Sequence, residues 1–375
     1  MAKGFYLTLK IGPMIPVTAP REVLDALTSV QVHTTAGEIA SGFELKFNLS
    51  KRSPLNTLFL LSGGSPIPMV RVMIVVTIDG VSETLMDGMM TRHEISPGSG
   101  ANPSTLTIKG TDLTTAMDYF KFSIPYPAMP PEVRILAILA KYAFLGVIPV
   151  VIPSVLTDVP IPVERIPRQN GTDLEYIKQL ADEAGYVFYM EPGPVPGTSK
   201  AYWGPEVRVG IPQPALNTDF DGHTNVESLN FTFDAESRKQ VFLLYTNPAI
   251  KVPIPIPLPD ISLIKPPLAL VPPAPKAIET VSRLSKLSAI QVALTGLSQA
   301  AKNADSVTAD GSLDVLRYGH ILTARGLVGV RGAGEALDGL YFVKSVTHNI
   351  KRGEYKQSFT LSRDGLISIT SKVPV

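Results

Sequence analysis

The sequence predicts a mainly β protein with α+β parts. Short runs of β-branched and apolar residues, separated by turn dipeptides, occupy both ends of the chain. Between them lie helical patterns and a proline-rich apolar stretch. Several short strands at close spacing favour a barrel or sandwich over a parallel sheet with helical crossovers. We therefore expect β domains at both ends of the chain.

Composition excludes several classes of function. The 375 residues are enough for two to four compact units. Lys and Arg number 34 and Asp and Glu 33, so the chain lacks the basic excess of nucleic-acid-binding proteins, and we expect no specific nucleic-acid binding. The absence of cysteine excludes disulfides, thiolate nucleophiles and cysteine metal sites. Only 18% of residues are charged and 45% are hydrophobic, which favours a subunit that buries surface against partners.

The first β domain is expected over residues 1–115. Runs with strand composition cover residues 5–11, 38–48, 69–78, 83–95 and 104–110. Three turn dipeptides punctuate them: Asp79-Gly80, Asp87-Gly88 and Pro97-Gly98.

A mixed α/β domain is expected over residues 116–215. Residues 112–119 favour a short helix. Pro131 fits the first turn of a second helix, where its missing N–H leaves no hydrogen bond unmade, and Glu132 complements the helix dipole. The apolar side of this helix comprises Ile135, Leu136, Leu139 and Tyr142.

The strongly apolar residues 133–152 raise the question of a membrane span. A spanning helix needs about 20 apolar residues with few charges. Arg134 and Lys141 interrupt the stretch, and Pro149 would break a helix. We therefore expect no membrane span, and instead a buried helix that runs into an extended strand.

The clearest local pattern predicts a helix over residues 173–184. Thr172 and Glu175 have the spacing of a capping box, and Gly185 is a suitable left-handed terminator. The apolar residues Leu174, Ile177, Leu180, Ala181 and Ala184 share one face. Residues 186–191 then alternate as a strand.

Residues 248–304 are predicted to form a proline-rich extended arm followed by an amphipathic helix. The prolines between residues 247 and 276 exclude a helix or an interior strand, because proline fixes φ and lacks the N–H that a ladder needs. Over residues 277–303 apolar side chains recur at helical spacing: Ile278, Val281, Leu284, Leu287, Ile290, Leu294 and Leu297.

The second β domain is expected over residues 216–247 and 305–370. Strand patterns cover residues 327–330, 340–350 and 355–362, and the hairpin-type dipeptides Asp338-Gly339 and Arg352-Gly353 separate them. We expect Tyr341, Phe342 and Tyr355 in the core. The sequence shows no repeat between the two β-rich ends.

Motifs for catalysis or cofactor binding are incomplete. His93-Glu94 opens like a zinc-protease helix, but Pro97 stands where the second ligand belongs. Gly332-Ala-Gly334 resembles the start of a dinucleotide fingerprint, yet Leu337 replaces the third glycine, and tight turns explain it better.

Three further features have both a structural and a functional interpretation. Asp219, Asp221 and Asn225 form either a turn or a hard-cation site, and the turn is favoured. The scattered histidines fit surface or core positions better than ligation: His33, His93, His223, His320 and His348. An aromatic cluster fits a core or interface patch better than a sugar-stacking platform: Tyr186, Tyr189, Tyr202 and Trp203. We therefore nominate no catalytic, cofactor-binding or metal residue and expect no cofactor.

Two stretches of the chain combine several motifs in a characteristic order. The first is RQNGTDLEYIKQLADEAGYVFY, residues 168–189, with a Thr-Asp-Leu opening, a helix, Ala-x-Glu-x-Gly-like residues and an aromatic strand. The second is VRGAGEALDGLYFVKSVTHNI, residues 330–350, followed by Tyr355 and Phe359-Thr-Leu-Ser-Arg363. Together the two stretches resemble the phage late control D and VgrG hub family, and the second is similar to the closing hairpin of that family. The order and separation of the two stretches also fit.

The resemblance implies a non-enzymatic baseplate hub. It implies two tail-tube-like β-barrels joined by mixed α/β segments, and a homotrimer that links the hexameric tail tube to a trimeric spike. Because the chain stops soon after the closing hairpin, the spike is expected to be a separate protein. Other baseplate proteins are further partners. Assembly in the bacterial cytoplasm and a place in a virion tail or injection-particle baseplate follow from the resemblance.

Two alternatives remain open at this point. A cell-wall or glycan hydrolase of the same machine requires a carboxylate pair in a groove. A carbohydrate-binding module requires exposed aromatic rings, with Trp203 or Tyr202 as the candidates.

Overall fold

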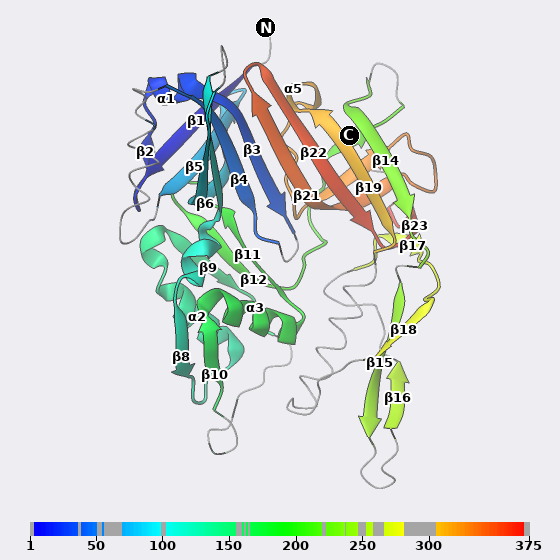
Figure 1. The fold of residues 1–375 in the computed structure, drawn as a ribbon. Helices are drawn as coiled ribbons and strands as arrows, with labels where there is room; N and C mark the ends of the chain where they lie inside the picture. Colours follow the sequence, from blue (N-terminus) through cyan, green and yellow to red (C-terminus); the bar gives the residue numbers. More distant parts are fainter. Residues whose placement is uncertain are drawn as a thin grey trace.

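A computed structural model describes residues 4–36, 39–50, 55, 70–98, 103–154, 160, 163, 166–219, 223–236, 238–246, 253–257, 266–280 and 305–370. In this part of the chain one antiparallel-rich sheet of 13 strands dominates, and four smaller sheets accompany it (Figure 1). The prediction of a mainly β protein with α+β parts is confirmed.

The first β-rich unit contains five strands in one antiparallel sheet. They are β3 (Leu27–Thr35), β4 (Gly42–Leu49), β5 (Arg71–Ile78), β6 (Val81–Ser96) and β7 (Ser104–Asp112), in the sheet order β3-β4-β7-β6-β5. Strands β1 (Phe5–Gly12) and β2 (Val17–Thr18) continue the sheet beyond β5, and helix α1 (Arg21–Ala26) precedes β3. All the predicted runs form strands, whereas β3 was not predicted.

Only one of the two Asp-Gly dipeptides in this unit is a turn. Asp79 and Gly80 adopt left-handed φ angles of 47° and 84° and join β5 to β6 as a two-residue hairpin. The prediction of a turn at Asp87-Gly88 is wrong, because both residues lie inside β6. A side chain at position 88 would come within 2.3 Å of the Thr111 carbonyl oxygen, so glycine allows β6 and β7 to approach.

The second β-rich unit has the same topology. Its strands are β14 (Val226–Phe233), β19 (Val307–Asp314), β20 (Leu327–Arg331), β21 (Gly339–Lys351) and β22 (Glu354–Arg363), in the sheet order β14-β19-β22-β21-β20. In both units the first two strands in the chain pair with each other, and the fifth strand lies between the second and the fourth. Helix α5 (Val315–Tyr318) follows β19, and β13 (Gln213–Asn217) runs parallel to β20.

The pairing registers of the two units agree as well. Lys46 faces Thr107 and Phe47 faces Leu106 between β4 and β7. At the corresponding place between β19 and β22, Ser312 faces Ser358 and Leu313 faces Gln357. The chain therefore contains two copies of one five-stranded unit, a repetition that the sequence did not show.

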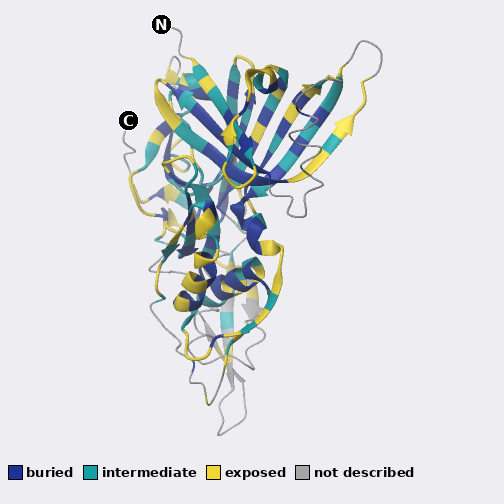
Figure 2. Ribbon diagram, turned by 90° about the vertical axis from the view of Figure 1, so that its left-hand side faces the viewer, coloured by how far each residue is buried: buried dark blue, intermediate teal, exposed yellow. Residues whose placement is uncertain are grey.

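The two units form one continuous sheet. Strand β21 pairs antiparallel with β3, from Ser345–Thr35 to Lys351–Ser29. One hydrophobic core runs beneath both units, with Val32, Leu45 and Ile108 from the first and Val343 and Leu361 from the second. Figure 2 shows the resulting alternation of buried and exposed residues along the strands. Tyr341, Phe342 and Tyr355 are buried, as predicted.

A mixed α/β part with its own core lies below the first unit in Figure 1. Its helices are η3 (Leu113–Asp118), α2 (Pro131–Ala140), η4 (Ala143–Leu145) and α3 (Asp173–Ala184). Its strands are β8 (Lys121–Pro125), β9 (Val147–Val151), β10 (Arg168–Thr172), β11 (Val187–Pro192) and β12 (Ser199–Gly204).

The helix predictions for this part are confirmed. Thr172 and Glu175 form the capping box of α3, and Gly185 ends the helix at a left-handed φ of 71°. Pro131 occupies the first turn of α2, which leads through η4 into β9. Among the described residues no helix has the length and apolar character required to cross a membrane.

The described part of the proline-rich segment is extended, as predicted. Strand β16 (Pro253–Pro257) pairs with β15 (Lys239–Thr246) at the edge of a small sheet, and β17 (Ala269–Val271) pairs with β23 (Leu366–Ser368). The predicted helix does not begin at residue 277, because Ala277–Thr280 forms β18, parallel to β15. Residues 281–303 of that prediction lie outside the described residues.

Candidate assembly surface

One face of the large sheet is lined by polar side chains that bond across the strands. Side-chain hydrogen bonds link neighbouring strands at four places: Ser228–Ser312 (2.8 Å), Thr360–Asp310 (2.7 Å), Gln31–Asn349 (3.0 Å) and His33–Thr347 (2.8 Å). Because strand residues alternate between faces, these contacts define a single polar face that crosses from β14 to β3.

Exposed ion pairs offset part of the charge beside these polar contacts. Lys46 and Lys109 both contact Glu44, at 2.9 and 3.2 Å. The side-chain hydrogen bond from Lys46 is the main reason why the pKa of Glu44 is lowered. Such exposed pairs each contribute only about 0–1 kcal/mol to stability. Glu44 therefore offsets one of the two lysine charges in this cluster, which lies on a broad hydrophilic surface.

The sheet has free backbone edges at two places relevant to assembly. Strand β14 pairs only with β19, so its other edge is open in the described structure. Strand β6 pairs with β5 up to Met89 and with β7 from Gly88 onward. Its residues 90–96 therefore have no described strand on the side opposite β7. Such edges are templates for pairing with another chain.

Arg363 holds the loop between β20 and β21 in place through hydrogen bonds to backbone carbonyl groups. It is fully buried, and its guanidinium donates to the carbonyl oxygens of Ala336 (2.7 Å), Asp338 (2.9 Å) and Gly365 (2.8 Å) while it lies over the Tyr341 ring. Burial lowers the pKa of this guanidinium. The arginine at the end of the family-like motif thus holds the β20–β21 loop against β22.

Two buried ion pairs, which sequence analysis missed, connect the parts of the molecule. The Arg71 guanidinium bonds both oxygens of Asp87 at 2.7 and 2.6 Å. Arg71 also donates to the Gly197 carbonyl (3.2 Å), and Ser199 donates to Asp87 (3.1 Å), which ties the sheet to the β11–β12 hairpin. The sequence feature that could have revealed this pair is Arg71 itself, a single arginine within the apolar strand run of residues 69–78.

The second buried pair joins Arg208 to Asp305 near the end of β12 and the start of β19. Its two hydrogen bonds measure 2.8 and 2.7 Å, and Lys344 and Ser362 also contact Asp305. Burial disfavours the charge of Arg208, but the contacts with Asp305 and Glu206 together outweigh it and raise its pKa.

Of the four aromatic residues singled out in the sequence, Tyr186 and Trp203 lie in the core of the mixed part, and Tyr189 and Tyr202 are half-buried. Trp203 is fully buried against Tyr186, with ring centroids 4.7 Å apart. Tyr189 stacks on Tyr202, and Arg325 lies 3.9 Å from the centre of the Tyr189 ring. Because the Trp203 ring is inaccessible, it cannot serve as a sugar-stacking platform.

Several other polar residues that were considered in the sequence make local structural contacts. The Asn225 side chain accepts from the Asn217 N–H (2.8 Å) and donates to the Ala215 carbonyl (2.9 Å), as expected for a turn. Asp219 has a left-handed φ of 51°, and Asp221 lies outside the described residues. The described coordinates contain no metal-ligating group of three or more acidic or histidine side chains. Buried His348 bonds to the Tyr355 hydroxyl (2.8 Å).

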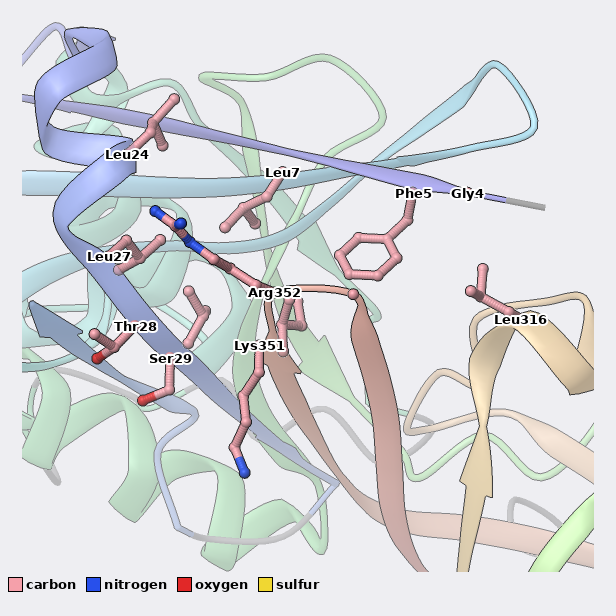
Figure 3. Close-up of a pocket in the computed structure, with 13 residues that line it drawn as sticks. Gly4, Phe5, Leu7, Leu24, Leu27, Thr28, Ser29, Leu316, Lys351 and Arg352 are labelled. Carbon is pink, nitrogen blue, oxygen red and sulfur yellow. The ribbon is translucent and has the colours of Figure 1, made fainter. Parts of the chain in front are cut away.

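Three cavities in the described part of the chain each lack a carboxylate pair with room for a glycan around it. One of them, of about 160 Å³, lies on the polar face and has Glu44 as its single acidic lining residue. Another, of about 450 Å³, lies where the two units meet, between β1, α1, β3 and the β21–β22 turn (Figure 3). Its lining is apolar apart from Thr28, Ser29, Lys351 and Arg352, and includes no acid. The third has the acidic lining residues Asp87, Asp112 and Glu191, but its volume of about 10 Å³ holds one water molecule at most.

Exposed apolar residues gather on elements of the mixed part. Helix α2 buries Ile135, Ile138 and Leu139 but leaves Val133 and Leu136 exposed. A helix that is apolar on most of its circumference normally contacts neighbours on both sides. Phe144 on η4 and Ile148 on β9 are also exposed.

Solved structures of tail proteins have the same fold. A tail protein from Neisseria meningitidis MC58 is 15% identical, with a TM-score of 0.64, and the match covers 97% of this chain and 98% of that one. The 43 kDa tail protein of prophage MuSo2 from Shewanella oneidensis is 15% identical, with a TM-score of 0.60 and coverages of 97% and 100%.

A third match is an E. coli protein described as a component of the type VI secretion system with structural similarity to the T4 bacteriophage tail proteins gp27 and gp5. It is 11% identical, with a TM-score of 0.56 and coverages of 98% and 79%. No family model and no curated protein matches the sequence. At these low identities the likeness establishes the fold, and on that basis the chain has the architecture of these tail proteins over nearly its whole length.

Proposed function

We propose that this chain is the structural hub of a contractile phage tail or a phage-like injection system. In this role it is a homotrimer that links the hexameric tail tube to a separate trimeric spike protein and contacts other baseplate proteins. It assembles in the bacterial cytoplasm and resides in the baseplate of the virion tail or injection particle. It catalyses no reaction.

The observation that carries this proposal is the repeated five-stranded unit. A hexameric tube cannot dock on a trimeric spike through equivalent contacts unless an adaptor presents both symmetries. Three copies of a chain that contains two units of the same topology and register would offer six similar units to the tube. The same three copies would offer three mixed α/β parts to the spike.

In the proposed ring, residues 1–115 form one tube-like domain, and residues 216–247 with 305–370 form the other. The polar face of the sheet lines the central channel, where paired charges and hydroxyl groups allow a transported macromolecule to pass without binding strongly to the wall. The opposite face is unsuitable for this purpose because it packs on the core.

The exposed apolar residues of α2, η4 and β9 are the surface that we assign to the spike. Val133, Leu136, Phe144 and Ile148 are each at least two-fifths exposed, at 45%, 43%, 56% and 49%. Apolar side chains at the centre of an interface supply much of its stability.

Nucleation of the tail tube tests this function. Purified chain, mixed with monomeric tube protein from the same gene cluster, is expected to shorten the lag of tube growth and to sit at one end of each tube in electron micrographs. Tubes that grow at an unchanged rate and carry no density at either end would overturn the proposal.

A further inference from the structure

The internal repeat specifies how neighbouring copies would join. Strands β6 and β21 are equivalent: each pairs with one neighbour through its first half and with another through its second half. Each also has an irregularity at the same point, between Met90 and Arg92 in β6 and between Val343 and Ser345 in β21. Ser345 of β21 therefore corresponds to Arg92 of β6.

Strands β3 and β14 are equivalent by the same criterion. The pairing of β3 with β4 shifts between Leu27 and Ser29, and that of β14 with β19 shifts between Val226 and Ser228. Thr35 of β3 therefore corresponds to Asp234, which directly follows β14.

Within one chain, the second half of β21 pairs with β3. In the equivalent half of β6 the Met90 N–H donates to the Val70 carbonyl (2.9 Å), and residues 91–96 have no described strand on that side. The outer edge of the equivalent strand β14 is likewise open in the described structure. We propose that these two edges pair between copies, so that β14 of one subunit continues the sheet along β6 of the next. This proposal rests on the ring proposed above, and it adds the contact and its register.

The register follows from the β21–β3 ladder. Ser345 faces Thr35, Thr347 faces His33, and Asn349 faces Gln31 in that ladder. Transferred to the equivalent positions, Arg92 faces Asp234, Glu94 faces Thr232, and Ser96 faces Asn230 in the neighbouring copy. The ladder ends there because Pro97 has no N–H to donate.

The side chains brought together by this register are chemically matched on both faces. On the polar face Arg92, which pairs with Glu94 of its own strand at 2.6 Å, would also meet Asp234 of the neighbouring copy, and Ser96 would meet the amide of Asn230. On the core face Ile95, which is 46% exposed, meets Phe231, and the 44% exposed Phe233 lies beside it. A shift of one residue would place these apolar side chains on the polar face, so the register is specific.

Cysteine pairs test the contact cleanly, because the chain contains no cysteine of its own. The double variant Glu94→Cys/Thr232→Cys places thiols at facing positions of neighbouring copies. Facing residues in an antiparallel ladder alternate between hydrogen-bonded and non-hydrogen-bonded pairs, so Ile95→Cys/Phe231→Cys tests the other type of pair. At least one of the two should give covalent trimers on mild oxidation, seen by denaturing electrophoresis without reductant.

Two controls accompany this experiment. His33→Cys/Thr347→Cys occupies the equivalent positions within one chain, and it should give an intrachain disulfide at the mass of one subunit. Glu94→Cys/Asn230→Cys is displaced by two residues along β14, where Cβ atoms about 7–8 Å apart are too distant for a disulfide. It should remain uncross-linked.

Charge reversal gives an independent readout. Arg92→Asp or Asp234→Arg alone should raise the concentration needed for trimer formation about tenfold, because each places like charges opposite one another, and the two together should restore it. Trimers that form normally but cross-link in neither facing pair would overturn this register and leave the hub proposal standing. A chain that forms no trimer under any condition would overturn both.

Discussion

Single buried polar residues hold this molecule together at points where strands change partners. Arg363, Arg71 and Arg208 each satisfy several acceptors away from water. Only the first of them belongs to a pattern recognisable in the sequence. The partners of the other two come from distant parts of the chain, so composition and spacing could not reveal them.

Replacement of Arg363 by lysine should destabilise the fold by about 2–4 kcal/mol. Lysine keeps the charge but cannot reach three carbonyl groups in one plane, so buried acceptors lose their donors. Denaturant unfolding of the two proteins measures the difference. Arg317→Lys, at an exposed position, should change stability by less than about 0.5 kcal/mol. An equal effect of both substitutions would contradict the role of Arg363 in holding the β20–β21 loop against β22.

His348 should lower the free energy of unfolding as the pH falls. Burial, aided by the charge of His33, lowers the pKa of His348 from 6.5 to about 3. Between these pH values the unfolded chain binds a proton that the folded chain excludes, so this residue reduces stability as pH falls through that window. His348→Asn keeps an acceptor near the Tyr355 hydroxyl but does not titrate.

The measurement is unfolding of wild type and His348→Asn at pH 7, 5 and 4. The wild type should be the more stable protein at pH 7, and its advantage should shrink steadily toward pH 4. Other acidic groups act equally on both proteins, so the difference isolates this imidazole. An advantage that stays constant across the series would show that His348 titrates normally.

Among the secondary-structure elements, those with strong local signals were predicted well. Helix α3 has a capping box, an apolar face and a glycine terminator, all readable from adjacent residues. Strand β18 was misassigned because its residues fit a helical period, whereas pairing with β15 decides its conformation. Strand β3 was missed because no turn dipeptide separates it from α1.

Loss of the α3 cap should cost about 1 kcal/mol. In Thr172→Ala the Glu175 N–H loses its acceptor, and the contact with Asp118 is lost as well. Thr172→Ser should recover most of the stability, because its hydroxyl can make both bonds. Thermal unfolding of the three proteins provides the comparison, and a serine variant as unstable as the alanine variant would contradict the capping explanation.

The contact between the sheet and the mixed part should depend on Asp87. Asp87→Asn leaves the buried Arg71 without a counter-charge, and we expect a loss of about 3–5 kcal/mol. Lys200→Gln removes an exposed pair with Glu191 and should change stability by less than about 1 kcal/mol. Denaturant unfolding followed by Trp203 fluorescence compares them. Equal effects would mean that burial of the pair is unimportant.

At the scale of the whole molecule, the sequence indicated two β-rich ends, which the structure contains, and the fold is that of solved tail proteins. The sequence did not reveal that the two ends repeat one topology or that they form a single sheet. Topology and register depend on which strands meet, and different side chains can satisfy the same alternation of apolar and polar positions. The repeat is therefore visible in strand pairing and invisible in residue identity.

The central claim is that three copies close a ring with six similar units around a channel. Native mass measurement combined with class averages from electron microscopy tests it most directly. We expect particles of three times the 40.3 kDa subunit mass, with a central hole and an apparent sixfold outline on a threefold body. A chain that stays monomeric with tube and spike proteins present, or a closed ring of any other number of copies, would contradict the account.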